Sequence, residues 1–339
     1  MKRKIPVAIL GATGSVGQSF VRLLKDHPWF YIAELVASKR SAGKKFGDFV
    51  PNTHLEDHFI KAVSDSLSSK IVFSALDAQV AGEIESSLAR KGHWVISNCR
   101  NHRYDPDVPL LIPEVNPEQL HWIKRQQFGG GVIVTNPNCS VIGLALTLKP
   151  LVEAFGVEQV HVVTLQAVSG AGFRARTILD IDDNVIPYIS GEEEKIEKEL
   201  DKILCIKRVS AQCNRVSVSD GHTQCVSVKL SQTASLEEIK SAWTAFRSPV
   251  LPSSPSKPIH YFNEESYPQP KLHRMLEKGM AVSVGRLRKC SLFDIKYATL
   301  SHNTIRGAAG CAIMNAELLI DHHYNGDIVG ASSLIGQCP

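Results

Sequence analysis

The chain has 339 residues, 43% of them hydrophobic and 21% charged, which is enough apolar material for two packed domains of ordinary size. The formal net charge of +4 is spread along the sequence. Because no basic block is interleaved with aromatic residues, the composition argues against a nucleic-acid partner.

The sequence also lacks the features of a membrane or secreted protein. The apolar run near the N-terminus is too short for a membrane span and meets a glycine-rich turn instead of a cleavage site. The eight cysteines are scattered, without a CxxC pair or a compact Cys/His cluster. We therefore expect a cytoplasmic protein that binds small molecules, with no membrane contact, no metal, and mostly buried thiols.

Up to residue 138 the sequence alternates between short β-branched runs and amphipathic stretches. We expect strands at 4–12, 31–38, 70–76, 93–97 and 131–138, and helices at 15–27 and 78–92. Alternation of strands and helices predicts a parallel sheet covered on both faces, so residues 1–138 are expected to form a Rossmann-type domain.

The stretch GATGSVG lies between the first expected strand and the first expected helix. Backbone N–H groups at such a helix start can hold a phosphate, so we predict a dinucleotide site there. A tight turn that binds nothing is the alternative. The expected cofactor contacts in this turn are Gly11, Thr13, Gly14, Ser15 and Val16.

The second strand should end in a carboxylate if the cofactor were NAD, because a carboxylate binds the ribose 2′-hydroxyl. The sequence instead offers ASKRSAGKK, with Ser38, Arg40 and Ser41 at this place. Hydroxyls and cations suit a 2′-phosphate, so NADP(H) is the expected cofactor. An ordinary solvated basic loop is the alternative.

From residue 139 the pattern changes to one helix followed by long strand-like runs. We expect helices at 140–155, 190–204 and 235–246 and strands at 157–169, 213–220, 222–230 and 293–301, with Ser190 as a helix start. These elements predict a second α+β domain, residues 139–306, built on a mixed, largely antiparallel sheet. The Pro- and Ser-rich segment 247–272 is expected to be a surface loop or a subunit contact.

Cys139 directly precedes the expected helix at 140–155. At a helix N-terminus, the helix dipole and unpaired N–H groups lower the pKa of a thiol, which favours a nucleophilic cysteine. Asn136, Asn138 and the amide of Cys139 could donate hydrogen bonds to an oxyanion. The alternative is an inert buried thiol.

A nucleophile of this kind usually works with a histidine. His222 follows a strand-like run that carries Arg215, and a glycine between them allows the chain to turn. Without further information, a histidine in a hairpin turn is the favoured interpretation.

Seven motifs resemble those of the aspartate-semialdehyde dehydrogenases: GATGSVG, SNCRNHRYD, TNPNCS, LQAVSGAG, GEEEKIEKELDKIL, NRVSVSDGHT and HNTIRGAAG. They occur in this order over nearly the whole chain, and two of them resemble the archaeal and fungal branch. The resemblance implies NADPH-dependent reduction of L-aspartyl-4-phosphate to L-aspartate 4-semialdehyde, with release of inorganic phosphate, through a cysteine thioester. It places the reaction on the route to lysine through diaminopimelate, and to threonine and methionine, in a homodimer or homotetramer.

The resemblance also implies roles for individual residues. Cys139 would form the thioester, Gln166 would orient it, and His222 would act as acid and base. Arg215 would bind the substrate α-carboxylate in a bidentate manner. Arg103, together with Asn138, would grip the phosphoryl group.

The helix at 190–204 contains two Glu-x-x-Lys pairs, Glu192 with Lys195 and Glu199 with Lys202. The family pattern fits Glu199 and Lys202 better, which would assign the substrate ammonium to the glutamate and the phosphate to the lysine. A surface ion pair is the alternative for either pair.

The last motifs concern the cofactor. Asn303 resembles the residue that fixes the nicotinamide carboxamide, while Ser169 and Gly170 resemble contacts near the ribose. A helix at about 307–339 is expected to return to the nucleotide domain and complete it.

Three residues depart from the family pattern, namely Arg174, Arg176 and Ser217.

Three other functions stay open at this stage. They are N-acetyl-glutamyl-phosphate reductase, a CoA-dependent semialdehyde reductase such as malonyl-CoA reductase, and an NADP-binding sensor without turnover.

Overall fold

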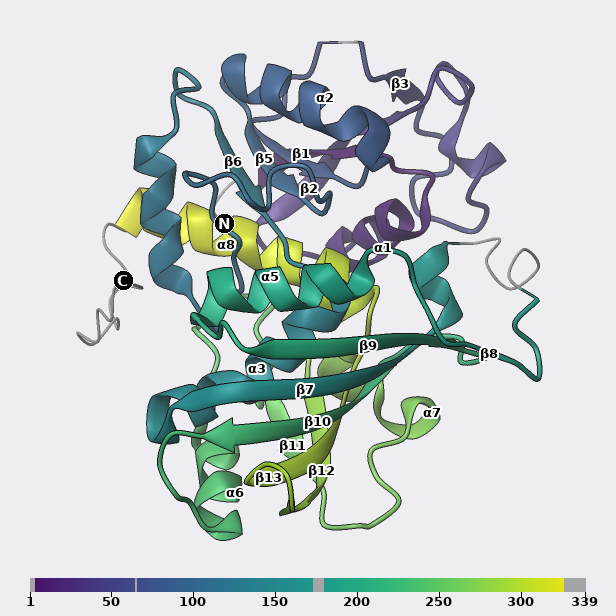
Figure 1. The fold of residues 1–339 in the computed structure, drawn as a ribbon. Helices are drawn as coiled ribbons and strands as arrows, with labels where there is room; N and C mark the ends of the chain where they lie inside the picture. Colours follow the sequence, from purple (N-terminus) through teal and green to yellow (C-terminus); the bar gives the residue numbers. More distant parts are fainter. Residues whose placement is uncertain (1–3, 65, 173–179, 326–339) are drawn as a thin grey trace.

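The computed structural model describes residues 4–64, 66–172 and 180–325 (Figure 1). Within this part of the chain, the strands form one six-stranded and one seven-stranded sheet. The smaller sheet has the order β3-β2-β1-β4-β5-β6, and all of its pairs are parallel. Its strands are β1 (Ile5–Leu10), β2 (Phe30–Ala37), β3 (Ile60–Ala62), β4 (Ile71–Ser74), β5 (Trp94–Ser97) and β6 (Val132–Thr135).

Helices cover both faces of this parallel sheet, as the sequence predicts. Alternate residues of β1 belong to different cores, because successive side chains point to opposite faces of a strand. Val7 and Ile9 pack with α1 (Ser15–Leu24) and with the C-terminal helix α8 (Gly310–Asn325). Ala8 and Leu10 pack with α2 (Ala78–Arg90). The described part of α8 therefore completes the first sheet's core from the far end of the chain.

The larger sheet is mixed and has the order β11-β12-β13-β10-β7-β9-β8. Antiparallel pairing joins β10 to β7 and β13, and β12 to β13, whereas β7 runs parallel to β9. The strands are β7 (Val157–Gln166), β8 (Val185–Ile186), β9 (Val209–Val216), β10 (His222–Leu230), β11 (Ile259–Tyr261), β12 (Val282–Lys289) and β13 (Ile295–Ser301).

Three helices pack on one face of this sheet, α3 (Cys139–Phe155), α5 (Glu192–Leu204) and α6 (Leu236–Ala245). Helix α3 is buried along most of its length, because it is apolar on nearly every side. In Figure 1, α5 and α8 run between the two sheets.

The remaining helical pieces are short. They are the 3₁₀ helices η1 (Phe46–Asp48), η2 (Pro117–Arg125), η3 (Val168–Ala171) and η4 (Leu276–Gly279), the helix α7 (Pro270–His273), and the π-helical turn η5 (Ile305–Ala309) that leads into α8. Among the described residues, no helix has the length and apolar character needed to cross a membrane.

The structure corrects three local predictions. The strand expected at 213–220 lies four residues earlier, at Val209–Val216. Helix α5 begins at Glu192, and its N-cap is Gly191 with a φ of 69°, not Ser190. Glycine enters this left-handed conformation without the penalty of a Cβ, which explains why it takes the cap position. The segment 247–272 is not entirely irregular, because Ile259–Tyr261 pairs in parallel with Val282–Val284 at the sheet edge.

Candidate active site

A cavity of about 210 Å³ opens where the N-termini of α1 and α3 meet the ends of β7 and β9. Most of the residues that the sequence proposes for catalysis and substrate binding come together here. The cavity is lined by Ser15, Val16, Asn98, Arg103, Pro137, Asn138, Cys139, Gln166, Ser169, Gly170, Glu192, Arg215, Asn303, Thr304, Gly307 and Ala308.

Cys139 is the first residue of α3, and Asn138 is its N-cap. The Asn138 side-chain oxygen accepts a hydrogen bond from the Ser140 amide at 2.9 Å, which satisfies one of the free N–H groups of the first turn. The sulfur of Cys139 lies 3.3 Å from Nε2 of His222. The thiol and the imidazole, 83 positions apart in the sequence, are therefore in direct contact.

The prediction of a lowered thiol pKa is wrong for this structure. Burial, followed by the charge of Glu192, raises the pKa of Cys139 to about 12, although Arg215 and Arg103 act in the opposite direction. Even the roughly 2 kcal/mol that a helix N-terminus contributes in a partly buried site is about 1.5 pKa units, which is less than the rise from 9.0 to about 12. The loss of water around the sulfur therefore outweighs the helix dipole.

His222 begins β10 and is completely buried. The backbone N–H of Ala167 donates to its Nδ1 at 3.1 Å, so the proton of the neutral ring lies on Nε2, which faces the Cys139 sulfur. Burial, with Arg215 as the second cause, lowers the pKa of His222 to about 3. At neutral pH the structure thus pairs a neutral thiol with a neutral imidazole.

Gln166 ends β7, and its direct register partner Arg215 is the last residue but one of the neighbouring parallel strand β9. Parallel strands end at the same edge of a sheet, and this explains why both side chains reach the cavity. Arg215 is 5% exposed, and its Nη1 donates to the Ala167 carbonyl at 2.7 Å. A Cβ at Gly170 would lie 2.9 Å from Arg215 Nη1, so a side chain at position 170 would push against the guanidinium.

Glu192 presents its carboxylate to the cavity from the first turn of α5. Its Oε2 accepts from Asn138 Nδ2 at 2.9 Å, and its Oε1 pairs with Lys195 at 2.6 Å. Burial alone would raise the pKa of Glu192, but Lys195 and the hydrogen bonds outweigh it, and the pKa is lowered. The first of the two Glu-x-x-Lys pairs, not the second, therefore supplies the cavity carboxylate.

Arg103 lines the cavity, and two hydrogen bonds within the protein fix its guanidinium group. Its Nη1 pairs with Glu199 at 2.8 Å, and its Nη2 donates to the Asn98 carbonyl at 2.9 Å. Its buried Nε has no hydrogen-bond partner within the described residues. Such a free donor fits an anionic ligand.

The structure does not bring every predicted residue to the cavity. Glu199, Lys202 and His222 are not among the described residues that line it, and Glu199 and His222 are completely buried, although His222 contacts Cys139 from behind the cavity wall. Asn136 is turned away from the thiol, because its Nδ2 donates to Asn98 Oδ1 and to the Ala308 carbonyl. The expectation that Asn136 supports an oxyanion is therefore corrected.

Asn303 and Ser169 lie at the cavity's edge and are joined to each other. Asn303 Nδ2 donates to Ser169 Oγ at 2.9 Å, and its Oδ1 accepts from the Gly221 amide at 2.9 Å. Gly307, in the π-helical turn, approaches the nucleophile so closely that a Cβ there would lie 2.8 Å from Cys139 Cβ. Sequence reasoning missed Gly307 as a wall of the site, although the glycines of the last motif were a signal for close approach.

A second cavity of about 510 Å³ lies on the other side of the α1 N-terminus, lined by Thr13, Gln18, Ser38, Arg40, Ser41 and Phe49. Its hydroxyls and guanidinium are the groups that a 2′-phosphate requires. Between the two cavities runs the glycine turn. Gly11 has a φ of 75°, and a Cβ there would lie 2.3 Å from the Ala75 carbonyl oxygen, so only glycine fits.

The sequence predicts no metal site, and three of its residues depart from the family pattern. Within the described part of the chain, no three His, Cys, Asp or Glu side chains are arranged to hold a metal ion. Ser217 donates to Asp182 Oδ1 at 3.1 Å. Arg174 and Arg176 lie outside the described residues.

Two family models match the chain. The model described as "Semialdehyde dehydrogenase, NAD binding domain" matches residues 6–123, and the model described as "Semialdehyde dehydrogenase, dimerisation domain" matches residues 148–306. An aspartate-semialdehyde dehydrogenase from Archaeoglobus fulgidus is 44% identical over 335 residues, covering 93% of this chain and 97% of the relative. The enzyme of that name from Saccharomyces cerevisiae is 42% identical over 361 residues, with 94% and 99% covered.

Solved structures agree with the sequence comparison. The crystal structure of aspartate semialdehyde dehydrogenase with NADP from Candida albicans has a TM-score of 0.84 and 40% identity, and covers 94% of this chain and 99% of its own. Aspartate semialdehyde dehydrogenase II from Vibrio cholerae, complexed with ASA, has a TM-score of 0.82 and 27% identity, with 95% and 100% covered.

Proposed function

The chain belongs to the semialdehyde dehydrogenase family and, within it, to the aspartate-semialdehyde dehydrogenases, and on this premise we propose roles for the residues of its cavity. The chain uses NADPH to reduce L-aspartyl-4-phosphate to L-aspartate 4-semialdehyde and inorganic phosphate, through a cysteine thioester. This reaction belongs to the biosynthesis of lysine, threonine and methionine.

Arg215 and Glu192 bind the two charged groups of the amino-acid head. The Arg215 guanidinium takes the α-carboxylate, because it is nearly buried, carries several donors and has one of them fixed by the Ala167 carbonyl. Glu192 takes the α-ammonium as the one carboxylate among the described residues that line the cavity. The two side chains thus fix the orientation of the substrate with respect to Cys139.

Binding of the ammonium also activates the nucleophile. The charge of Glu192 is the second cause, after burial, that raises the pKa of the Cys139 thiol. An ammonium beside Glu192 compensates that charge, so the thiolate becomes less costly when substrate is bound. The Nε2–H of His222 then donates to the sulfur from 3.3 Å away and stabilises the thiolate.

The sulfur attacks the acyl carbon, a C–S bond forms, the C–O bond to the phosphoryl group breaks, and the thiol proton leaves on the phosphate as hydrogen phosphate. Phosphate leaves with the bonding electron pair toward Arg103, whose Nε is an unused donor. The backbone N–H of Cys139 would donate to the carbonyl oxygen that becomes negative during the attack, because the neighbouring N–H groups of Asn138 and Ser140 already donate within the protein. Gln166 lies beside them and orients the thioester.

The two cavities at the glycine turn fit the two ends of NADPH. Thr13, Ser38, Arg40 and Ser41 would hold the adenosine 2′-phosphate, and Asn303 would hold the carboxamide at the nicotinamide end. The remaining proposed contacts are Gly11, Gly14, Ser15, Val16, Ser169 and Gly170. When bound, NADPH supplies the hydride that reduces the thioester.

His222 completes the reaction. Hydride transfer and a proton from water give a thiohemiacetal, whose hydroxyl proton must depart as the C–S bond breaks, while the departing sulfur needs a proton. His222 gives its Nε2 proton to sulfur and takes the hydroxyl proton in exchange. The aldehyde and the free thiol result, and the ring is neutral again.

Particular residues support this function over the alternatives. An N-acetylated substrate has no ammonium for Glu192, which would leave this carboxylate facing an amide. A CoA-dependent reductase would not need Arg103, with its unused buried donor, in the wall of the cavity. An NADP sensor would not need the contact between Cys139 and His222, which is the single observation that carries the proposal.

The match to a dimerisation domain over residues 148–306 supports an oligomer. We assign residues 1–138, with α8, to the nucleotide domain and residues 139–306 to catalysis and dimerisation. The working unit would be a cytoplasmic homodimer or homotetramer, joined through the seven-stranded sheet. Light scattering of the purified protein would check its mass against the single chain.

The function is tested by NADP reduction with purified protein and aspartate semialdehyde, with and without inorganic phosphate, next to Cys139→Ser. We expect steady turnover that requires phosphate and disappears in the variant. Steady turnover that requires CoA in place of phosphate would instead favour the acyl-CoA reductase. Bound NADP without turnover under either condition would favour a sensor.

A further inference from the structure

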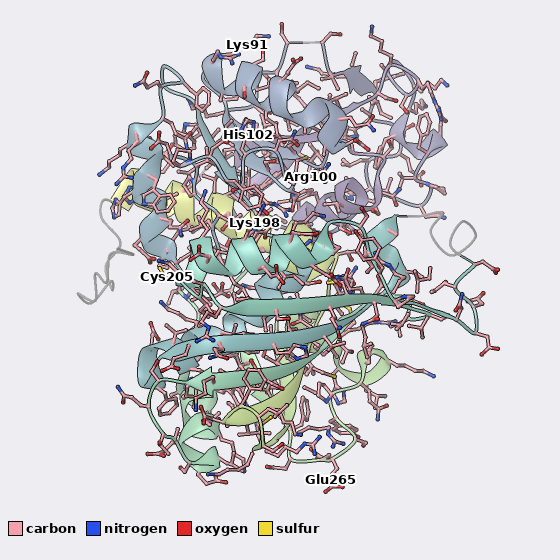
Figure 2. The ribbon with its side chains drawn as sticks, in the orientation of Figure 1. Lys91, Arg100, His102, Lys198, Cys205 and Glu265 are labelled. Atoms are coloured by element: carbon pink, nitrogen blue, oxygen red, sulfur yellow. The ribbon has the colours of Figure 1, made fainter. Side chains whose placement is uncertain are left out.

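Helix α5 carries two Glu-x-x-Lys pairs that lie on the same side, because seven residues are close to two helical turns. The first pair reaches the cavity through Glu192. The second pair, Glu199 and Lys202, lies two turns further along and contacts the loop that contains Arg103. In Figure 2, Arg100 and His102, which belong to this loop, are seen above α5, where Lys198 is labelled.

Lys202 has no donor left for a phosphate. An ammonium group carries three N–H bonds. Those of Lys202 point to the carbonyl oxygens of Arg103, Asp105 and Val108 at 2.7, 2.8 and 2.9 Å. Its Nζ also lies 5.6 Å from the centre of the Trp122 ring. The lysine therefore binds the backbone of the Arg103 loop.

Glu199 uses both oxygens within the protein. Its Oε1 accepts from Arg103 Nη1 at 2.8 Å, and its Oε2 accepts from the backbone N–H of Asn138 at 2.6 Å. Asn138 caps the helix that begins with Cys139. One buried carboxylate therefore connects the arginine at the phosphate side of the cavity with the helix end that carries the nucleophile.

We propose that Glu199 and Lys202 are positioning residues that act through Arg103 and never touch the substrate. Lys202 holds the backbone of residues 103–108, and Glu199 holds the guanidinium of Arg103. Together they hold Arg103 in the wall of the cavity from which phosphate leaves, or which it enters in the reverse reaction. The proposal rests on the function given above, because it concerns the phosphate part of that same site.

A double-mutant cycle between Lys202 and Arg103 tests this proposal in the phosphate-dependent direction. The KM for phosphate is measured with full-length wild type, Lys202→Met, Arg103→Gln and the double variant. We expect Lys202→Met to raise this KM roughly 10-fold and Arg103→Gln roughly 50-fold, as for loss of charged hydrogen bonds. If Lys202 acts only through Arg103, the double variant has the same KM as Arg103→Gln alone.

Direct contact between Lys202 and phosphate would make the effects multiply, to roughly 500-fold, and would overturn the proposal. A KM for NADP that rises as much as the KM for phosphate would also overturn it, since this indicates general damage. Lys240→Met is the matched control, because Lys240 forms an exposed ion pair with Glu237 on α6. It should leave both constants unchanged.

Thermal unfolding of every variant shows whether it is folded under the assay conditions. If Lys202→Met does not fold, Glu199→Gln provides a second cycle with Arg103→Gln. We again expect the double variant to have the same KM for phosphate as Arg103→Gln alone. Wild type without phosphate-dependent turnover would refute the proposed function. An active wild type with multiplying effects in the cycle would refute only the positioning role.

Discussion

The sulfur of Cys139 and Nε2 of His222 lie 3.3 Å apart, and neither group is charged at neutral pH. Burial raises the pKa of the thiol to about 12 and lowers that of the imidazole to about 3. Because the Ala167 amide occupies Nδ1, the imidazole proton faces the sulfur. The free enzyme therefore keeps its nucleophile protonated, and the substrate has to contribute to its activation.

The first prediction concerns the reactivity of Cys139 in the free enzyme. With a thiol pKa of about 12, the rate of alkylation by iodoacetamide should rise about tenfold per pH unit from pH 7 to pH 9. Cys139→Ser corrects for the other thiols. A plateau below pH 8 would show instead that the helix N-terminus lowers the pKa after all.

Glu192→Gln should separate two effects of this carboxylate. Without the negative charge, the pKa of Cys139 falls, and alkylation of the free enzyme at pH 8 should become roughly 3- to 10-fold faster. The KM for aspartate semialdehyde should rise at the same time, because the ammonium loses its partner. Glu237→Gln on the surface is the control, and a slower alkylation in Glu192→Gln would count against the account.

Acid stability should depend on His222. Its folded pKa of about 3 lies below the ordinary value of 6.5, so between these pH values the unfolded chain binds a proton that the folded protein does not. The free energy of unfolding should therefore fall as the pH drops from about 6.5 toward 3. Denaturant unfolding at pH 7 and pH 5 should show a smaller loss for His222→Asn than for wild type, and an equal loss would contradict the assignment.

Arg40→Ala should change the choice of cofactor. Arg40 is the one guanidinium among the described residues of the larger cavity, where the 2′-phosphate is expected. Loss of a charged hydrogen bond predicts a KM for NADP higher by roughly 10- to 100-fold, with little change in the KM for NAD. Exposed Arg90, at the end of α2, offers a control through Arg90→Ala. Equal effects on both cofactors would place the 2′-phosphate elsewhere.

The fold was predictable where local patterns carried it. The alternation of strands and helices before residue 138 and the apolar helix after Cys139 are strong periodic signals, and both are confirmed. The short strands β3, β8 and β11 were not predictable, since three residues or fewer give no period. Strand β11 exists because residues 259–261 find a partner in β12 that is distant in the sequence.

The site, like the fold, contains features that the sequence predicted and features that it did not. The motif order pointed to Cys139, Gln166, Arg215 and His222, which the structure brings together. Sequence could not decide between Glu192 and Glu199, because both face one side of α5 and only the packing of the 98–108 loop buries the second. The thiol pKa was mispredicted for a related reason, since desolvation is a property of the assembled site and not of the helix alone.

The most direct test of the central claim is rapid-mixing kinetics with aspartate semialdehyde and NADP in the absence of phosphate. If Cys139 forms a thioester, NADPH should appear in a burst of about one equivalent per active site and then stop, and added phosphate should restart it. The burst should be absent from Cys139→Ser. A wild-type protein that produces no NADPH until phosphate is added would show that hydride transfer does not pass through an acyl-enzyme at Cys139.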